Sequence, residues 1–196
     1  VNTTQNPNDF TIGTLLQGPT TYDWNGQLQQ PLIYEGIWTA AEVRDLYLQQ
    51  VDDIPTTYGW FLDGDSASGL TSSSPALTPI NSPDIYEDDA VPVDWLNEKG
   101  WNGVGTFDGV DDVVTFDSAI TLAKSAASVT FWAKRNSAGN ADTIFGGSAA
   151  STSYIALTAS GRITLETDTN ADAATFDLDS DDTEWHHYAV VFSSST

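Results

Sequence analysis

Polar and apolar residues alternate along most of the second half of the chain. In residues 127–134, one side of the alternation is apolar, and the other is polar apart from Trp132. A period of two residues indicates a strand with one face on a core. The same period recurs in residues 154–158 and 162–167, which are separated by hairpin turn residues, and again in residues 174–178.

The last run, residues 184–192, is apolar on both faces. A strand of this kind is typical of the inside of a sandwich, where both faces are covered, so we expect it there. Two earlier strands are expected at residues 10–16 and 27–34, with residues 25–26 as the turn between them. Pro31 lacks a backbone donor, which predicts that its strand lies at an edge or contains a bulge.

One helix is expected, at residues 40–49. Thr39 can cap its N-terminus, and Glu42 completes a capping box. One face of the helix carries Val43, Leu46 and Tyr47. By contrast, residues 64–92 are rich in Ser, Pro, Asp and Gly, which predicts a long acidic surface loop. Many short strands, one small helix and frequent turns predict an all-β sandwich.

Composition narrows the possible functions. The 196 residues include 28 acidic but only 6 basic ones, for a net charge of −22, and no Cys. No apolar run could span a bilayer and no basic cluster could neutralise phosphates, which argues against membrane insertion and against nucleic acid as a partner. Since 40% of the residues are hydrophobic, the acids belong on the surface of a folded body. The charge favours cations, high salt or neutral ligands.

Three segments, taken in order, resemble the laminin-G-like, concanavalin A-like jelly-roll family: residues 106–116 (TFDGVDDVVTF), 128–133 (SVTFWA) and 184–191 (EWHHYAVV). Residues 24–34 and 38–47 resemble the closing strand and terminal helix of the same family, yet here they come first. The resemblance implies a jelly-roll sandwich of two antiparallel sheets with one short helix. It also implies adhesion or recognition at an extracellular, cell or virion surface.

The inverted order divides the chain into two expected pieces. Residues 1–50 would hold the closing strands and terminal helix of a laminin-G-like module. Residues 54–196 would hold the opening and central strands of a second or permuted module, with the acidic loop at 64–92 outside the resemblance. Three explanations remain open: a window on a tandem array, a circular permutation, or a sandwich completed by a neighbouring copy. Neighbouring copies of the same or a similar module are therefore candidate partners.

Calcium is the candidate cofactor, because oxygen ligands at alternate positions of one loop can converge on Ca²⁺. One candidate set is Asp168, Asn170 and Asp172. Ala173 and Asp179 stand where a calcium loop has Gly and Glu, so an ordinary polar hairpin loop is the alternative. Laminin-G-like modules frequently hold calcium at the sandwich rim, and this resemblance suggests a second set, Asp108, Asp111 and Asp112. Gln29 and Gln30 replace an acidic pair that such modules often carry, which weakens a cation role there.

Trp132 and Tyr154 are the candidate ligand-binding residues, because aromatic rings can stack on the apolar face of a sugar. The alternative is that the second sheet or the acidic loop covers the face that carries Trp132. His186 and His187 point to opposite faces if they lie in a strand. They cannot then chelate one ion, so we expect them to be structural.

Catalytic motifs are incomplete. Concanavalin A-like glucanases place three carboxylates at alternate positions of one strand; Glu166 and Asp168 fit this pattern, but Asn170 occupies the third position. There is no Gly-x-Ser-x-Gly motif. The sequence therefore predicts a non-catalytic adhesion module that binds glycans or a cell-surface protein. The alternatives are a structural decoration or fibre module that self-assembles and, third, a β-glucan hydrolase.

Overall fold

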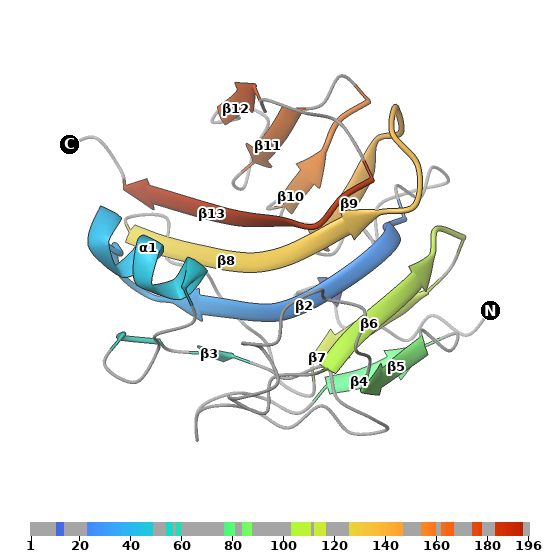
Figure 1. The fold of residues 1–196 in the computed structure, drawn as a ribbon, viewed down its shortest axis with the longest axis horizontal. Helices are drawn as coiled ribbons and strands as arrows, with labels where there is room; N and C mark the ends of the chain where they lie inside the picture. The colour runs from blue at the N-terminus through green and yellow to red at the C-terminus, as the bar shows by residue number, and fades with distance from the viewer. Residues whose placement is uncertain are drawn as a thin grey trace.

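The chain forms two antiparallel β-sheets with one helix at the side (Figure 1). The structure is a computed structural model that describes residues 11–13, 23–48, 54–56, 58–59, 77–80, 84–87, 103–110, 112–116, 126–146, 154–159, 162–166, 174–177 and 183–193. Within these ranges it contains thirteen strands and one helix. The predicted all-β sandwich of two antiparallel sheets is confirmed.

The strands fall into a seven-stranded and a six-stranded sheet. The seven-stranded sheet has the order β12 (Ala174–Asp177), β11 (Arg162–Glu166), β10 (Tyr154–Leu157), β9 (Asp142–Gly146), β1 (Thr11–Ile12), β7 (Val113–Phe116) and β4 (Leu77–Ile80). The six-stranded sheet has the order β13 (His186–Ser193), β8 (Ala126–Arg135), β2 (Asn25–Tyr34), β6 (Gly103–Asp108) and β5 (Asp84–Glu87), with β3 (Tyr58–Gly59) also paired to β2. The predicted hairpin of β10 and β11 is confirmed.

The N-terminal part of the chain supplies an inner strand to each sheet. β1 lies between β9 and β7, and β2 lies between β8 and β6. Strands from residues 1–50 and from residues 54–196, the two pieces expected from the sequence, therefore share both sheets.

A bulge in β2 explains how Pro31 is tolerated in an inner strand. The register with β8 shifts between Gln29 and Leu32, and Gln30 adopts a left-handed backbone with φ of 49°. One extra residue exchanges the two faces of a strand. Leu28 and Ile33 both reach the core for this reason, although they are five positions apart and a regular strand would point them to opposite faces. The expectation of an edge or a bulge at Pro31 is confirmed as a bulge.

The Asn-Gly pair at residues 25–26 is not a turn, and that prediction is wrong. Both residues belong to β2, where Asn25 pairs with Asp108 and Gly26 with Phe107 and Arg135. A Cβ at position 26 would clash with the carbonyl oxygen of Lys134. Glycine is required here for close approach of two backbones, which a local sequence pattern does not distinguish from a turn.

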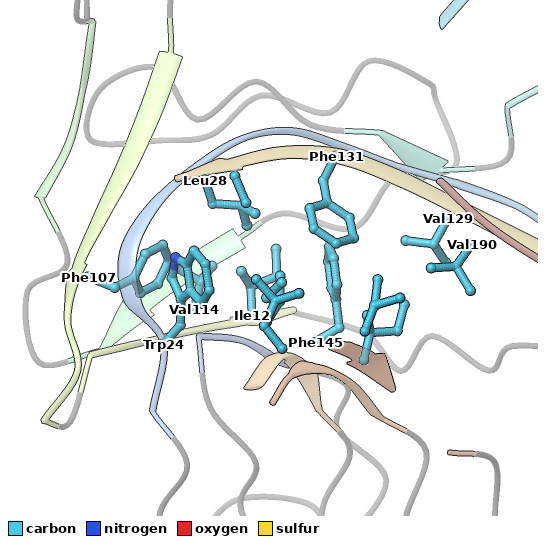
Figure 2. Packing of buried hydrophobic residues seen from close by; sticks show 14 of the residues in the cluster. Ile12, Trp24, Leu28, Phe107, Val114, Val129, Phe131, Phe145 and Val190 are labelled. Carbon is cyan, nitrogen blue, oxygen red and sulfur yellow. The ribbon is translucent and has the colours of Figure 1, made fainter. Parts of the chain in front are cut away.

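The hydrophobic core lies between the two sheets (Figure 2). The predicted alternation in β8 is confirmed: Val129 and Phe131 point inward, and Phe131 meets Phe145 of the opposite sheet with ring centroids 5.2 Å apart. Trp24 and Phe107 are fully buried at one end of this core, as Figure 2 shows. The motif at residues 106–116 thus builds core as well as the connection from β6 to β7.

Helix α1 (Ala40–Tyr47) packs on the outside of the six-stranded sheet. The Thr39 side chain accepts a hydrogen bond from the Glu42 backbone N–H, and the Glu42 carboxylate accepts one from the Thr39 N–H, so the predicted capping box is confirmed. Leu46 packs with Leu32 and Trp38 in a second apolar cluster. The Ser128 hydroxyl fixes the segment before the helix, because it accepts from the Trp38 N–H at 3.1 Å and donates to the Gly36 carbonyl at 2.8 Å.

Two further predictions need correction. The expected loop at residues 64–92 contains β4 and β5, which pair with β7 and β6 at the ends of the two sheets. Their sequences look like loop because edge strands tolerate proline and acidic residues. The other correction concerns β13, which was expected inside the sandwich. It is the terminal strand of its sheet, and its outward residues Ala189 and Val191 are exposed.

Candidate functional site

Three aromatic rings gather on the outer face of the six-stranded sheet. Tyr47 at the end of α1 stacks on Trp132 of β8, with ring centroids 5.5 Å apart and planes inclined by 25°. His187 of β13, which pairs with Trp132 in the sheet, lies 5.2 Å from Trp132 and 5.7 Å from Tyr47. We call Tyr47, Trp132 and His187 the outer aromatic cluster.

The cluster is partly open to solvent. Tyr47 retains 48% of its exposure, whereas Trp132 and His187 are half-buried. Trp132 shares its outward direction with Ser128, Thr130 and Lys134, because the core side of β8 carries Val129, Phe131 and Ala133. The stacking of Tyr47 on Trp132 shows that helix α1 partly covers Trp132.

Hydrogen bonds determine the orientation of His187. The Thr130 hydroxyl donates its hydrogen to the Tyr188 carbonyl oxygen at 2.8 Å, and its oxygen lies 2.5 Å from His187 Nε2. Since that hydrogen is already used, we infer that Nε2 carries a hydrogen and donates to Thr130. In the neutral ring, Nδ1 is then an acceptor. Burial lowers the pKa of His187 from 6.5 to about 4, so the ring is uncharged at neutral pH.

The bulge of β2 lies beside this cluster. Gln29 pairs with Trp132 across the sheet, and Gln30 is the residue with positive φ. Bulges commonly re-aim side chains next to functional sites. Both glutamines are more than nine-tenths buried, and the Gln30 Nε2 has no hydrogen-bond partner within the described structure. Amide groups thus occupy this part of the face.

The two predicted ligand-binding residues are not brought together. Ile155 and Leu157 of β10 belong to the core, so Tyr154 points away from the core, out of the seven-stranded sheet. Trp132 points out of the six-stranded sheet. Tyr154 and Trp132 therefore lie on opposite outer faces of the sandwich, and a small ligand can touch only one of them.

At one rim of the sandwich, acidic residues stabilise the connection from β6 to β7. The Asp112 carboxylate, which is buried, accepts a hydrogen bond from the Asp108 N–H at 2.9 Å. The Asp108 carboxylate in turn accepts one from the Val110 N–H at 2.8 Å. Each carboxylate thus satisfies a backbone donor of a tight turn.

Comparison with known proteins agrees with this architecture. Residues 108–196 match the laminin-G-type family model described as the concanavalin A-like lectin/glucanases superfamily. Over those residues, the chain is similar to this superfamily. No curated protein and no solved structure gives a significant match.

A concanavalin A-like module suits binding of a carbohydrate or a protein partner. Laminin-G-like domains are generally non-catalytic and typically extracellular, although the superfamily also includes glycosidases. In the part of the chain that the structure describes, no helix has the length and apolarity needed to cross a membrane.

Two of the predicted calcium ligands at the rim, Asp108 and Asp112, lie within the described residues. Each directs one carboxylate oxygen to a backbone N–H, and the calcium prediction itself stays a prediction. The described residues contain no group of three or more Asp, Glu, His or Cys side chains placed to hold a metal ion. The remaining predicted ligands lie outside the described residues: Asp111, Asp168, Asn170 and Asp172.

The carboxylate pattern that resembles the glucanases lies only partly within the described residues. Glu166 ends β11, and both Asp168 and Asn170 lie outside the described residues. His186 contacts Tyr188, with centroids 6.2 Å apart, while His187 contacts Trp132. The two histidines thus have separate surroundings.

The sequence pointed to Trp132 but not to its neighbours in the cluster. Tyr47 was recognised only as part of the packing face of a helix, and His187 only as a structural residue. A signal was present, because Tyr47 lies one turn beyond Val43 at the exposed end of an amphipathic helix. Its contact with Trp132, however, depends on where α1 docks, which no local pattern determines.

Proposed function

We propose that this chain is a non-catalytic recognition module, displayed outside a cell or on a virion surface, that binds glycans or a glycosylated cell-surface partner through the outer aromatic cluster. The observation that carries the proposal is the partly exposed stack of Tyr47 on Trp132, with His187 beside it. Aromatic faces next to polar groups suit sugars, which have apolar ring faces and hydroxyl edges. The similarity of residues 108–196 to the concanavalin A-like superfamily supports the same proposal.

The net negative charge of the chain favours neutral glycans over anionic ones as ligands. With a net charge of −22, the chain repels anionic sugars at long range. Beside Trp132 lies the uncharged ring of His187, whose Nδ1 is left to accept a hydrogen bond from a sugar hydroxyl, while the Gln29 and Thr130 side chains next to it are buried. Lys134 is the charged residue two positions along the same outer face of β8.

A glycan array with neutral and acidic members, probed with and without EDTA, tests the proposal. We expect neutral glycans to be retained under both conditions and acidic ones to bind less. Absence of binding at millimolar ligand in both arms would exclude glycan recognition. Binding lost with EDTA would instead move the site to a cation-dependent rim.

Surface variants locate the site. Replacing Tyr47 by alanine removes one stacking ring, and we expect affinity to fall about tenfold. Phe176→Ala is the matched control, because Phe176 is an exposed aromatic residue, with 55% exposure, on the other sheet. Tyr154→Ala tests the opposite face. A loss of binding with Tyr154→Ala but not with Tyr47→Ala would place the site there.

One observation favours the alternative of a structural module that assembles with copies of itself. Two outward side chains of the terminal strand β13, Ala189 and Val191, are exposed. His187 of the outer aromatic cluster lies on the same strand and contacts Tyr47, so this surface adjoins the proposed glycan site.

A further inference from the structure

The outer aromatic cluster contains a hydrogen-bond acceptor that is open to a ligand, Nδ1 of His187. Within the described residues, His187 forms its hydrogen bond through Nε2, to Thr130. Nδ1 has no partner there, yet it is not one of the buried polar atoms that lack a partner, so solvent reaches it. In the uncharged ring Nδ1 is an acceptor, and it can take one donor from a ligand.

The groups around this acceptor are apolar or already engaged. Trp132 and Tyr47 have ring centroids 5.2 Å and 5.7 Å from that of His187. Ala189, which is exposed, is the next outward residue of β13. The Thr130 hydroxyl donates its hydrogen to a backbone carbonyl and accepts from His187. The cluster thus offers a ligand an acceptor beside apolar surface.

A sugar hydroxyl can donate to Nδ1, but it matches this surface incompletely. A hydroxyl group carries one hydrogen and two lone pairs. When it donates its hydrogen to Nδ1, its oxygen lies near the ring faces of the cluster and the Ala189 methyl group, which carry no donor. The oxygen then loses water without gaining a hydrogen bond in return, and this costs free energy.

A secondary amide that carries a methyl group matches the surface better. Such an amide is planar and trans, so its N–H and its methyl group lie on the same side, and its carbonyl oxygen lies on the opposite side. The N–H can donate to Nδ1 while the methyl group packs on the rings and the carbonyl oxygen stays in water. The group is also uncharged, which suits a chain with a net charge of −22.

We propose that the outer aromatic cluster selects N-acetylated amino sugars over the parent sugars that carry a hydroxyl at the same carbon, and that His187 sets this preference. Nδ1 accepts the amide N–H, and the rings of Trp132 and Tyr47 contact the methyl group and the sugar ring. This inference rests on the proposed glycan binding, because it names the ligand class of the same site.

NMR titrations with N-acetylglucosamine and with glucose test the preference, since these two sugars differ at one carbon. We expect the acetylated sugar to bind about fivefold more tightly, which is the gain from about one net hydrogen bond. Equal affinities, or tighter binding of glucose, would overturn the preference and leave glycan binding intact. If neither sugar nor any other glycan binds at millimolar concentration, glycan recognition itself fails and the preference fails with it.

The same substitution at two neighbouring residues locates the preference. The amide nitrogen of a glutamine can replace Nε2 as the donor to Thr130, but the side chain has no acceptor where Nδ1 lies, so His187→Gln should abolish the preference with an unchanged far-UV spectrum. His186→Gln is the matched control and should keep the preference, because His186 pairs with the inward-facing Ala133 and contacts Tyr188. A preference that persists in His187→Gln, or one lost in His186→Gln, would overturn the assignment to His187.

Nitrogen NMR of the imidazole rings detects the hydrogen bond itself. The chain has two histidines, so the His187→Gln spectrum assigns the signals of the other ring. We expect the Nδ1 resonance of His187 to shift when N-acetylglucosamine is added, and to shift much less with glucose. An Nδ1 resonance that does not move while the acetylated sugar binds would overturn the proposal.

Discussion

At the scale of single residues, Arg135 and Asp142 form a buried ion pair where β8 connects to β9. Their side chains are only 4% and 6% exposed, and Arg135 Nη2 lies 3.1 Å from Asp142 Oδ2. The guanidinium also donates to the carbonyls of Asn140 and Thr158. Removing one partner of a buried pair leaves the other charge without its counterion. We therefore expect Asp142→Ala to lower the free energy of unfolding by about 3–5 kcal/mol in urea titration.

The control for this prediction removes both charges. Arg135→Met combined with Asp142→Leu keeps the apolar volume and leaves no uncompensated charge, so it should recover most of the stability lost in Asp142→Ala. If Asp142→Ala alone costs less than about 1 kcal/mol, the pair is not buried as the structure has it.

His187 makes stability depend on pH. Burial lowers its pKa from 6.5 to about 4, so the unfolded chain binds a proton more readily than the folded one. Its contribution to stability is therefore complete above pH 6.5 and declines as the pH falls from 6.5 towards 4. Carboxylates also gain protons as the pH falls, so a variant of His187 is needed to isolate its contribution to stability. In urea titrations between pH 7 and pH 4.5, His187→Gln should lose less stability on acidification than the unmodified chain; equal losses would contradict this.

At the scale of elements, local signals were sufficient for β8, for the hairpin of β10 and β11, and for α1. In each, the period or the capping residues lie within a few positions of one another. The sequence failed where distant partners decide the outcome. Gly26 resembles a turn residue until the Lys134 carbonyl is placed against it, and β13 resembles an inner strand until its partners are known. Within the candidate site, the sequence predicted Trp132. Tyr47 and His187 lie beside it because helix α1 docks and strand β13 pairs there, which no local pattern predicts.

The inner position of β2 predicts that the chain can be reassembled from two pieces. Residues 54–196 alone lack β2, the strand between β6 and β8. The backbone groups of β6 and β8 that pair with β2 in the whole chain then have no partner there. We expect this fragment to melt without a cooperative transition, and a peptide of residues 1–50 to restore one, measured by circular dichroism. A peptide carrying Gly26→Ala is the control and should fail, because the added Cβ meets the Lys134 carbonyl. If the fragment melts cooperatively on its own and its melt does not change when the peptide is added, residues 1–50 are not needed for folding.

At the scale of the whole molecule, charge opposes the fold. There are 28 acidic residues and 6 basic ones, and two of the basic residues are already engaged, Arg135 with Asp142 and Arg44 with Asp45. Few cations remain to offset the carboxylates. Repulsion between like charges at this density destabilises the folded state, and the Debye length falls from about 30 Å at 0.01 M salt to about 10 Å at 0.1 M.

We therefore expect the melting temperature, measured by calorimetry, to rise as the NaCl concentration increases. A melting temperature unchanged between low and high ionic strength would contradict this expectation.

Calcium chloride at matched ionic strength separates charge screening from calcium binding. Screening depends only on ionic strength, whereas a bound ion stabilises the folded state further as its own concentration rises. At 100 times its dissociation constant, one bound Ca²⁺ would contribute about 2.7 kcal/mol. An excess stabilisation by Ca²⁺ would indicate a bound ion, and Asp168→Asn is the variant that tests the predicted ligands after β11.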